Sequence, residues 1–277
     1  MKNFKRDLKK NTFVLLVSKP SLYLKELLWR TLLIGATTLA INLTIHWLEF
    51  DSFTIPASMH SLIGIVIGLL LVFRTNTAYD RWWEGRKMIS GLSHEVGLIS
   101  ARLSAMQTAN NKNYLDDFRN YVDELLKSLR DYLKIGDDGS ESTIFHLSQK
   151  RKMERAFKAL NKLGKADVNI SALNGSIGKL LEYSNALERI KNTPIPLSYK
   201  LHIKLSIFIY LMTLPFGLFH DLGMLAIPMV MLIYYIIAGV EIISNEIENP
   251  FAEDPNDLPT AELFTGIIDS LHDKEEE

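Results

Sequence analysis

Residues 61–73 read SLIGIVIGLLLVF, an apolar run in the middle of the uncharged segment between Asp51 and Arg74. Three further segments also lack Asp, Glu, Lys and Arg: 31–48, 205–220 and 222–240. A helix needs about 20 apolar residues to cross a hydrocarbon layer roughly 30 Å thick. We therefore predict four transmembrane helices, with approximate bounds 28–48, 57–76, 202–220 and 222–243.

The positive charges are unevenly distributed along the chain. Lysine and arginine are abundant in residues 1–30 and 74–200 but absent from the short connections 47–60 and 219–223. Cytoplasmic segments of membrane proteins carry the excess of these residues. The distribution therefore favours four spans with both termini in the cytoplasm over four buried helices of a large soluble core. The first basic stretch is too long for a cleaved signal peptide, and no small-residue cleavage site follows it.

Composition excludes several classes of function. The chain has 277 residues and no cysteine, so it has no disulfide framework, zinc–thiolate site or thiol nucleophile. It carries 31 Lys and Arg against 32 Asp and Glu, and this near-neutral total argues against nucleic acid as a partner. The 47% content of hydrophobic residues argues against wholesale disorder.

No motif of an enzyme is found. The stretch GSIGKL at 175–180 resembles a phosphate loop only faintly, because its glycines are too close together and no Ser or Thr follows Lys179. We interpret it as an ordinary helix start. The seven histidines show no metal-ligand spacing on one helix. We expect no catalytic residue and no enzymatic activity.

The segment 77–200 is predicted to be a soluble, helical, cytosolic region. Its apolar residues recur at helical spacing, first from Ile89 to Met106 and then at Leu115, Phe118, Val122, Leu125, Leu126, Leu129 and Leu133. We expect a loop at 137–142, a third helix capped by Ser142 or Thr143, and a fourth over 171–191. No alternating strand pattern occurs, so the predicted class is all-α, with residues 244–277 as a C-terminal cytosolic segment.

The second span carries a stripe of apolar residues. Ile65, Leu69 and Phe73 recur every four residues and share one side of a helix. Gly64 and Gly68 lie beside them as a G-x-x-x-G pair, which lets neighbouring helices approach closely. The stripe is consistent with lipid-facing or core packing, or with a ring of apolar side chains around a pore, one helix per subunit.

The segment 247–260, IENPFAEDPNDLPT, is rich in acidic residues. Glu253, Asp254 and Asp257 offer oxygen ligands of the kind that bind Ca²⁺, but the segment lacks the glycine and ligand spacing of an EF-hand. The alternative is a surface segment, interrupted by prolines, after the last span.

Three motifs together resemble the bestrophin family in its bacterial branch. They are FRTNTAYDRWWEGRK at 73–87, PIPLSYKLHI at 194–203 and IENPFAEDPNDLP at 247–259, and they occur in the family's order. The resemblance covers nearly the whole chain. It implies an all-α homopentamer around one axial pore, with four membrane-associated helices and a large helical cytosolic region per subunit. It also implies an ion channel; the eukaryotic members are calcium-activated anion channels.

The resemblance also assigns roles to single residues. Counting back from the Arg-Trp-Trp motif, the family's hydrophobic neck falls on Ile65, Leu69 and Phe73. Counting back from Tyr199, the lower cytosolic aperture falls on Ile177. The family's calcium clasp uses an acidic cluster after Asn-Pro-Phe, which Pro255 and Asn256 interrupt here. We therefore expect no cofactor and no requirement for Ca²⁺.

We expect a pentameric channel in the bacterial inner membrane that conducts small monovalent ions passively through the neck. Its partners are other copies of itself, the lipid bilayer and the permeant ions. The alternative is a membrane-anchored scaffold or receptor whose helical cytosolic region binds a partner. A secondary transporter is a third and weaker alternative, because the hydropathy of the chain shows no two-fold repeat.

Overall fold

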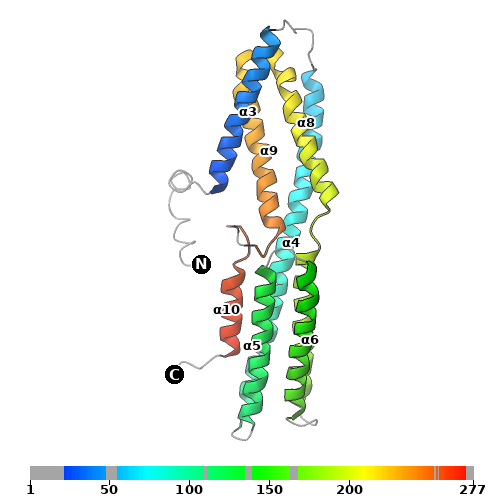
Figure 1. Ribbon diagram of the computed structural model, residues 1–277, viewed down its shortest axis with the longest axis vertical. Coiled ribbons are helices and arrows are strands. Elements are labelled where there is room, and N and C mark those ends of the chain that lie inside the picture. Colours follow the sequence, from blue (N-terminus) through cyan, green and yellow to red (C-terminus); the bar gives the residue numbers. More distant parts are fainter. Residues whose placement is uncertain are drawn as a thin grey trace. The chain divides into compact units, whose positions relative to one another are not determined.

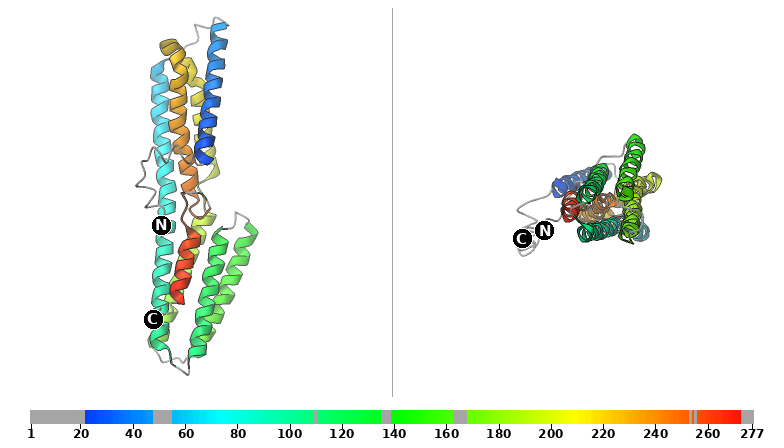
Figure 2. Two further views of the ribbon diagram at one scale, coloured as in Figure 1. Left: turned by 90° about the vertical axis from the view of Figure 1, so that its left-hand side faces the viewer. Right: turned by 90° about the horizontal axis from the view of Figure 1, so that it is seen from below.

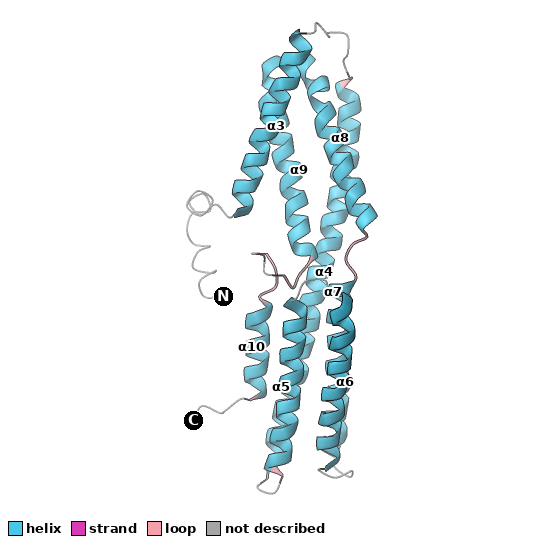
Figure 3. Cartoon of the chain, in the orientation of Figure 1, coloured by secondary structure: helices cyan, strands magenta, loops and turns pink. Residues whose placement is uncertain are grey.

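The computed structural model describes residues 22–47, 55–108, 111–134, 139–162, 168–252, 254 and 256–272. Within these ranges every regular element is a helix and no strand occurs (Figure 3). The predicted all-α class is therefore confirmed. The chain divides into two compact units: unit 1 contains residues 1–76 and 196–244, and unit 2 contains residues 77–195 and 245–277.

Unit 1 is built from long apolar helices. They are α3 (Leu22–Trp47), the first part of α4 (Ala57–Met106), α8 (Leu197–Leu222) and most of α9 (Ala226–Glu248). The end of α3, the start of α4 and the join between α8 and α9 lie at the same end of the unit (Figure 1). This join is the short helix η1 (Gly223–Leu225). Gly223 has φ 54°, a left-handed conformation that glycine adopts without a steric penalty.

Small residues allow the helices of unit 1 to pack closely. A Cβ atom on Gly35 of α3 would lie 2.6 Å from the sulfur of Met231 on α9. One on Gly217 of α8 would lie 2.6 Å from Nδ1 of His60 on α4. Side chains from three helices form the core: Ile67 and Leu71 of α4, Ile203, Ile207, Tyr210, Leu211 and Leu214 of α8, and Val230 of α9.

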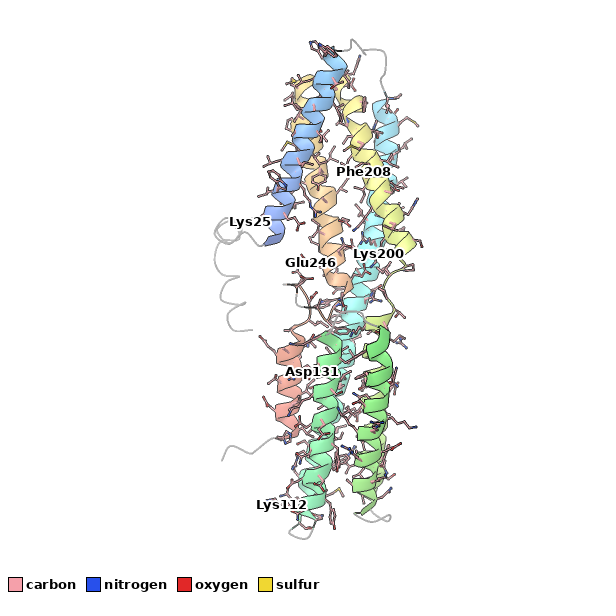
Figure 4. The ribbon with its side chains drawn as sticks, in the orientation of Figure 1. Lys25, Lys112, Asp131, Lys200, Phe208 and Glu246 are labelled. Carbon is pink, nitrogen blue, oxygen red and sulfur yellow. The ribbon has the colours of Figure 1, made fainter. Side chains whose placement is uncertain are left out.

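The outer surface of unit 1 is apolar. Trp29 on α3 is 66% exposed, and Phe208 on α8, marked in Figure 4, is 59% exposed. Three segments are long and apolar enough to cross a membrane: Lys25–Trp47, Ser58–Met106 and Leu197–Glu248. The last segment consists of α8, η1 and α9. These helices coincide approximately with the four predicted spans, whose number remains a prediction.

Unit 2 is a bundle around the second part of α4. It adds α5 (Lys112–Lys134), α6 (Gly139–Lys162), α7 (Val168–Asn192) and α10 (Thr260–Leu271). Helices α5 and α6 run side by side, and α10 packs against α5 (Figures 1 and 2). The apolar residues predicted to share one face of α5 are all buried in one core with residues of α4, α6, α7 and α10.

Two local predictions need correction, and one helix was not predicted. Residues 139–142 were expected in a loop, but α6 begins at Gly139, so Ser142 and Thr143 lie inside this helix and do not cap it. The GSIGKL stretch lies in the interior of α7, because α7 begins at Val168. Helix α10 was not predicted, although Phe264, Ile267, Ile268 and Leu271 bury one face of it. At 12 residues it is too short for its periodicity to stand out.

Candidate functional site

The predicted neck residues lie on the outside of a single chain. Ile65, Leu69 and Phe73 are 66%, 54% and 55% exposed, whereas Ile67 and Leu71 on the opposite side of α4 are buried. The stripe therefore does not pack into the core of its own subunit. It belongs to a wider exposed apolar face of α4 that also contains Leu62, Val66 and Val72. Such a face requires lipid, another subunit or a pore beside it.

The two glycines of this span have different surroundings. A Cβ atom on Gly64 would lie 2.9 Å from the hydroxyl oxygen of Tyr210, so Gly64 allows α4 to approach α8 within one subunit. A Cβ atom on Gly68 would meet no atom within 4 Å. Of these two glycines, only Gly64 thus serves close helix packing inside the described part of the chain.

Ile177 does not lie where the predicted aperture requires it. Its side chain is 2% exposed and belongs to the core of unit 2. A side chain enclosed by its own subunit cannot line an opening between subunits, and we therefore withdraw this assignment. The residues that α7 exposes beside it are Gly175, Gly178 and Lys179. Lys179 Nζ lies 2.9 Å from Oε1 of the buried Glu95, and this hydrogen bond raises the pKa of Lys179.

The three sequence motifs meet at Arg81 of α4. Its guanidinium donates hydrogen bonds to the carbonyl oxygens of Glu248 at 3.1 Å and Ile190 at 2.6 Å, and to that of Thr193. These carbonyls belong to the C-terminal ends of α9 and α7 and to the residue just after α7. The last carbonyls of a helix have no partner within it, so Arg81 supplies one to both helices. The backbone N–H of Ile195 completes the junction by donating to Oε1 of Glu248 at 3.3 Å.

The same stretch of α4 also holds the segment that follows α9. Trp82 Nε1 donates to the carbonyl oxygen of Asn256 at 3.1 Å. Phe251 is 1% exposed and lies against Gly85, where a Cβ atom would come within 3.2 Å of its ring. The Arg-Trp-Trp and Asn-Pro-Phe motifs are thus two sides of one packed junction inside unit 2. Sequence alone had assigned them to the family without showing this contact.

Two hydrogen bonds hold the described residues around Asp257 in the acidic segment. Oδ2 of Asp257 accepts the backbone N–H of Asp254 at 2.7 Å, and Asn256 donates to Oε2 of Glu246 at 2.6 Å (Glu246 is marked in Figure 4). Burial raises the pKa of Asp257 to about 6, against the opposing hydrogen bond from Asp254 and with the help of the nearby carboxylates of Asp254 and Glu246.

No metal site is evident in the part of the chain that the structure describes, where no three His, Cys, Asp or Glu side chains gather closely enough to hold an ion. Glu253, the third candidate ligand for calcium, lies outside the described residues. The expectation that Ca²⁺ is not required therefore stays a prediction.

A buried ion pair lies at the end of the apolar run in unit 1. Arg74 is 0% exposed, and its Nη1 lies 3.3 Å from Oε1 of Glu241 on α9. Lys204 of α8 lies 3.8 Å from the same oxygen. Sequence analysis missed this cluster; the available signal was a charge at the end of each apolar run, Arg74 after residue 73 and Glu241 after residue 240.

Comparison with known proteins identifies the family. The model of the bacterial and fungal bestrophin proteins matches residues 4–142 and 100–273, which is nearly the whole chain. The chain belongs to the bestrophin family. A relative from Nostoc sp. is 32% identical over 220 residues, which cover 71% of this chain and 70% of the relative. One from Synechocystis sp. is 31% identical over 264 residues, covering 88% and 85%. Both are named voltage-dependent anion channel-forming proteins.

The fold of this bestrophin also matches solved structures. A variant of a bacterial bestrophin homologue from Klebsiella pneumoniae superposes with a TM-score of 0.80 at 21% identity, over 89% of this chain and 97% of the other. This likeness concerns the fold. Together with the family match it confirms the resemblance that the three motifs indicated. The membrane-capable helices of unit 1 agree with a membrane protein.

Proposed function

We propose that this bestrophin is a passive ion channel formed by five copies of the chain around one axial pore in the bacterial inner membrane. Both termini lie in the cytoplasm, as the absence of Lys and Arg from the two short connections favours. The relatives named as anion channel-forming proteins support a channel that carries small monovalent anions.

The exposure of Ile65, Leu69 and Phe73 in a single chain carries the proposal. Three large apolar side chains, each more than half exposed, project from one stripe of a helix that could cross a membrane. One such stripe from each of five subunits would form three apolar rings. The first and last would lie about 12 Å apart along the helix, since eight residues each rise by about 1.5 Å.

An apolar ring acts as a gate because it offers an ion nothing that replaces water. Removing the hydration shell of an ion is very costly when no polar group substitutes for it. A narrow apolar constriction therefore excludes water and ions of either sign until it widens. Under this mechanism the neck sets how readily the pore fills with water, while charges elsewhere set the preference for anions.

The test is planar-bilayer recording of Ile65→Ala beside the matched control Ile63→Ala. Both replace isoleucine on α4, but Ile63 lies about 160° around the helix from Ile65, so it cannot share the same pore. We expect Ile65→Ala to increase the current with little change in anion preference. Ile63→Ala should leave the current close to that of the unmodified protein.

Two results would overturn the proposal. If the unmodified protein carries no current in liposomes, the chain is not a channel, and the membrane-anchored scaffold becomes the better explanation. If pentamers of both variants are intact by size exclusion and conduct equally, the protein remains a channel, but the neck does not lie at Ile65.

A further inference from the structure

Arg74 is a buried cation directly beside the proposed neck. Among the residues that the structure describes, it is the only Lys or Arg whose side chain is buried. It follows Phe73 in the chain, so the two side chains leave α4 about 100° apart. Phe73 is 55% exposed on the outer side of the helix, and Arg74 is 0% exposed on the side that packs against the rest of unit 1.

Glu241 of α9 is the carboxylate that Arg74 contacts. Nη1 of Arg74 lies 3.3 Å from Oε1 of Glu241, whose side chain is 15% exposed. Lys204 of α8 approaches the same oxygen at 3.8 Å, but the Lys204 side chain is 57% exposed and can be hydrated. A buried charge that loses its partner is strongly destabilising, whereas an exposed charge is not. The Arg74–Glu241 pair therefore holds α4 to α9 more firmly than Lys204 holds α8 to α9.

We propose that the Arg74–Glu241 ion pair is a latch that keeps the neck narrow, and that the neck opens more readily when the pair is broken. This inference rests on the proposed channel function. In the unmodified protein the apolar ring would widen as each α4 helix turns or moves outward. Helix α4 contains no proline between Ala57 and Met106, so Phe73 and Arg74 move together. A movement of α4 relative to α9 separates Arg74 from Glu241 and removes the carboxylate from a fully buried guanidinium, which opposes opening.

The test is single-channel recording of Glu241→Gln, which keeps the shape of the side chain and removes its charge. We expect the open-to-closed ratio to rise on the order of tenfold to a hundredfold for each subunit that moves, the effect of weakening one charge-assisted hydrogen bond in only one of two states, and by more when all five subunits move together. Single-channel conductance should stay unchanged, because Arg74 is fully buried and does not face the ion path.

Two controls separate a latch from general loosening and from a change of charge. Leu71→Ala truncates a core residue on the same side of α4, one turn before Arg74, and leaves the pair intact. It should lower thermal stability with little change in the open-to-closed ratio. Lys204→Gln removes the more exposed cation near Glu241 and should also leave that ratio nearly unchanged.

A double variant tests whether the two residues act as one unit. Arg74→Gln combined with Glu241→Gln should shift the ratio no further than Glu241→Gln alone, because the second change breaks a pair that is already broken. Additive shifts would mean that each charge acts on the pore independently, which would refute the latch.

Further outcomes would refute either the latch or the channel function. If Glu241→Gln lowers the ratio, leaves it unchanged, or shifts it no more than Leu71→Ala does, the latch is refuted while the channel function stands. A wild-type protein without current would instead refute the channel function itself. If Glu241→Gln does not assemble, Glu241→Asp keeps the charge but draws it back from Arg74. The open-to-closed ratio of Glu241→Asp is then compared with that of Leu71→Ala, and a shift no larger than that of Leu71→Ala refutes the latch.

Discussion

Arg81 offers a sharp test of how unit 2 is held together. Replacement by methionine keeps most of the aliphatic stem but removes the guanidinium that supplies partners to the carbonyl oxygens of Glu248, Ile190 and Thr193. The bond to Thr193 is exposed, so water can replace it, and we assign it no weight. The other two are partly buried.

The size of the effect follows from these two bonds. A hydrogen bond to a charged group contributes roughly 1.5–3 kcal/mol, so the loss of two gives about 3–6 kcal/mol before solvent is considered. Arg81 is itself only partly buried, and water entering the junction offsets part of the loss. We therefore expect the lower end, about 3 kcal/mol, for Arg81→Met. Lysine keeps the charge but not the planar fork that reaches several acceptors, so Arg81→Lys should lose about half of this, roughly 1.5 kcal/mol.

The assay is thermal unfolding in detergent, followed by tryptophan fluorescence. A loss of about 3 kcal/mol corresponds to a decrease in Tm of roughly 5–10 °C for a chain of this size. The control is Arg189→Met, which removes an arginine whose 3.1 Å pair with Glu84 lies on the surface. An exposed pair of this kind contributes about 1 kcal/mol or less. Equal Tm values for Arg81→Met and Arg189→Met would show that the junction at Arg81 does not hold α7 and α9.

Three further predictions concern topology, calcium and pH. A reporter that is active only in the periplasm should stay inactive when fused after Gly139, since that segment is predicted to be cytoplasmic. An active reporter at this position would show that the predicted topology is wrong. Channel current should not depend on micromolar Ca²⁺, and a steep calcium response abolished by combining Asp254→Ala with Asp257→Ala would contradict this. The pKa of Asp257, raised to about 6 in the folded protein, lies above its ordinary value of 3.8. Its ionisation therefore lowers stability above pH 6, and the loss is relieved as pH falls from 6 towards 4. Asp257→Asn should accordingly stabilise the protein by about 1 kcal/mol at pH 7.5, after allowance for partial exposure, and by almost nothing at pH 4. An equal gain at both values would assign the effect to something other than this carboxyl group.

Local patterns in the sequence were sufficient to predict the positions of most of the helices and the buried face of α5. In α5, apolar residues alternate with acids and bases at helical spacing, and the structure buries the predicted set from Leu115 to Leu133. This prediction succeeds because a helix between water and a core must separate the two kinds of side chain. The three motifs likewise identified the family, because their residues and order can be read without any structure.

The same method fails inside the apolar run of α4. Ile65 is 66% exposed and Ile67 is 3% exposed, although both are isoleucines in an unbroken apolar stretch. A membrane-capable helix is apolar on all sides, so its sequence carries no contrast between the side that faces its own subunit and the side that faces outward. The prediction for Ile177 fails for a different reason. Counting back from Tyr199 placed Ile177 at the cytosolic aperture, but the fold buries its side chain in the core of unit 2.

The contacts of the charged side chains could be found only in the tertiary structure. Arg74 meets Glu241 across 167 positions in the chain, and Arg81 meets Ile190 and Glu248 across 109 and 167. The sequence by itself determined the all-helical class, the apolar helices and the family, since these depend on residue type and local spacing. Only the tertiary structure decided which side of α4 faces outward and which charge each arginine contacts. Such contacts depend on how distant helices pack, and no local pattern encodes that.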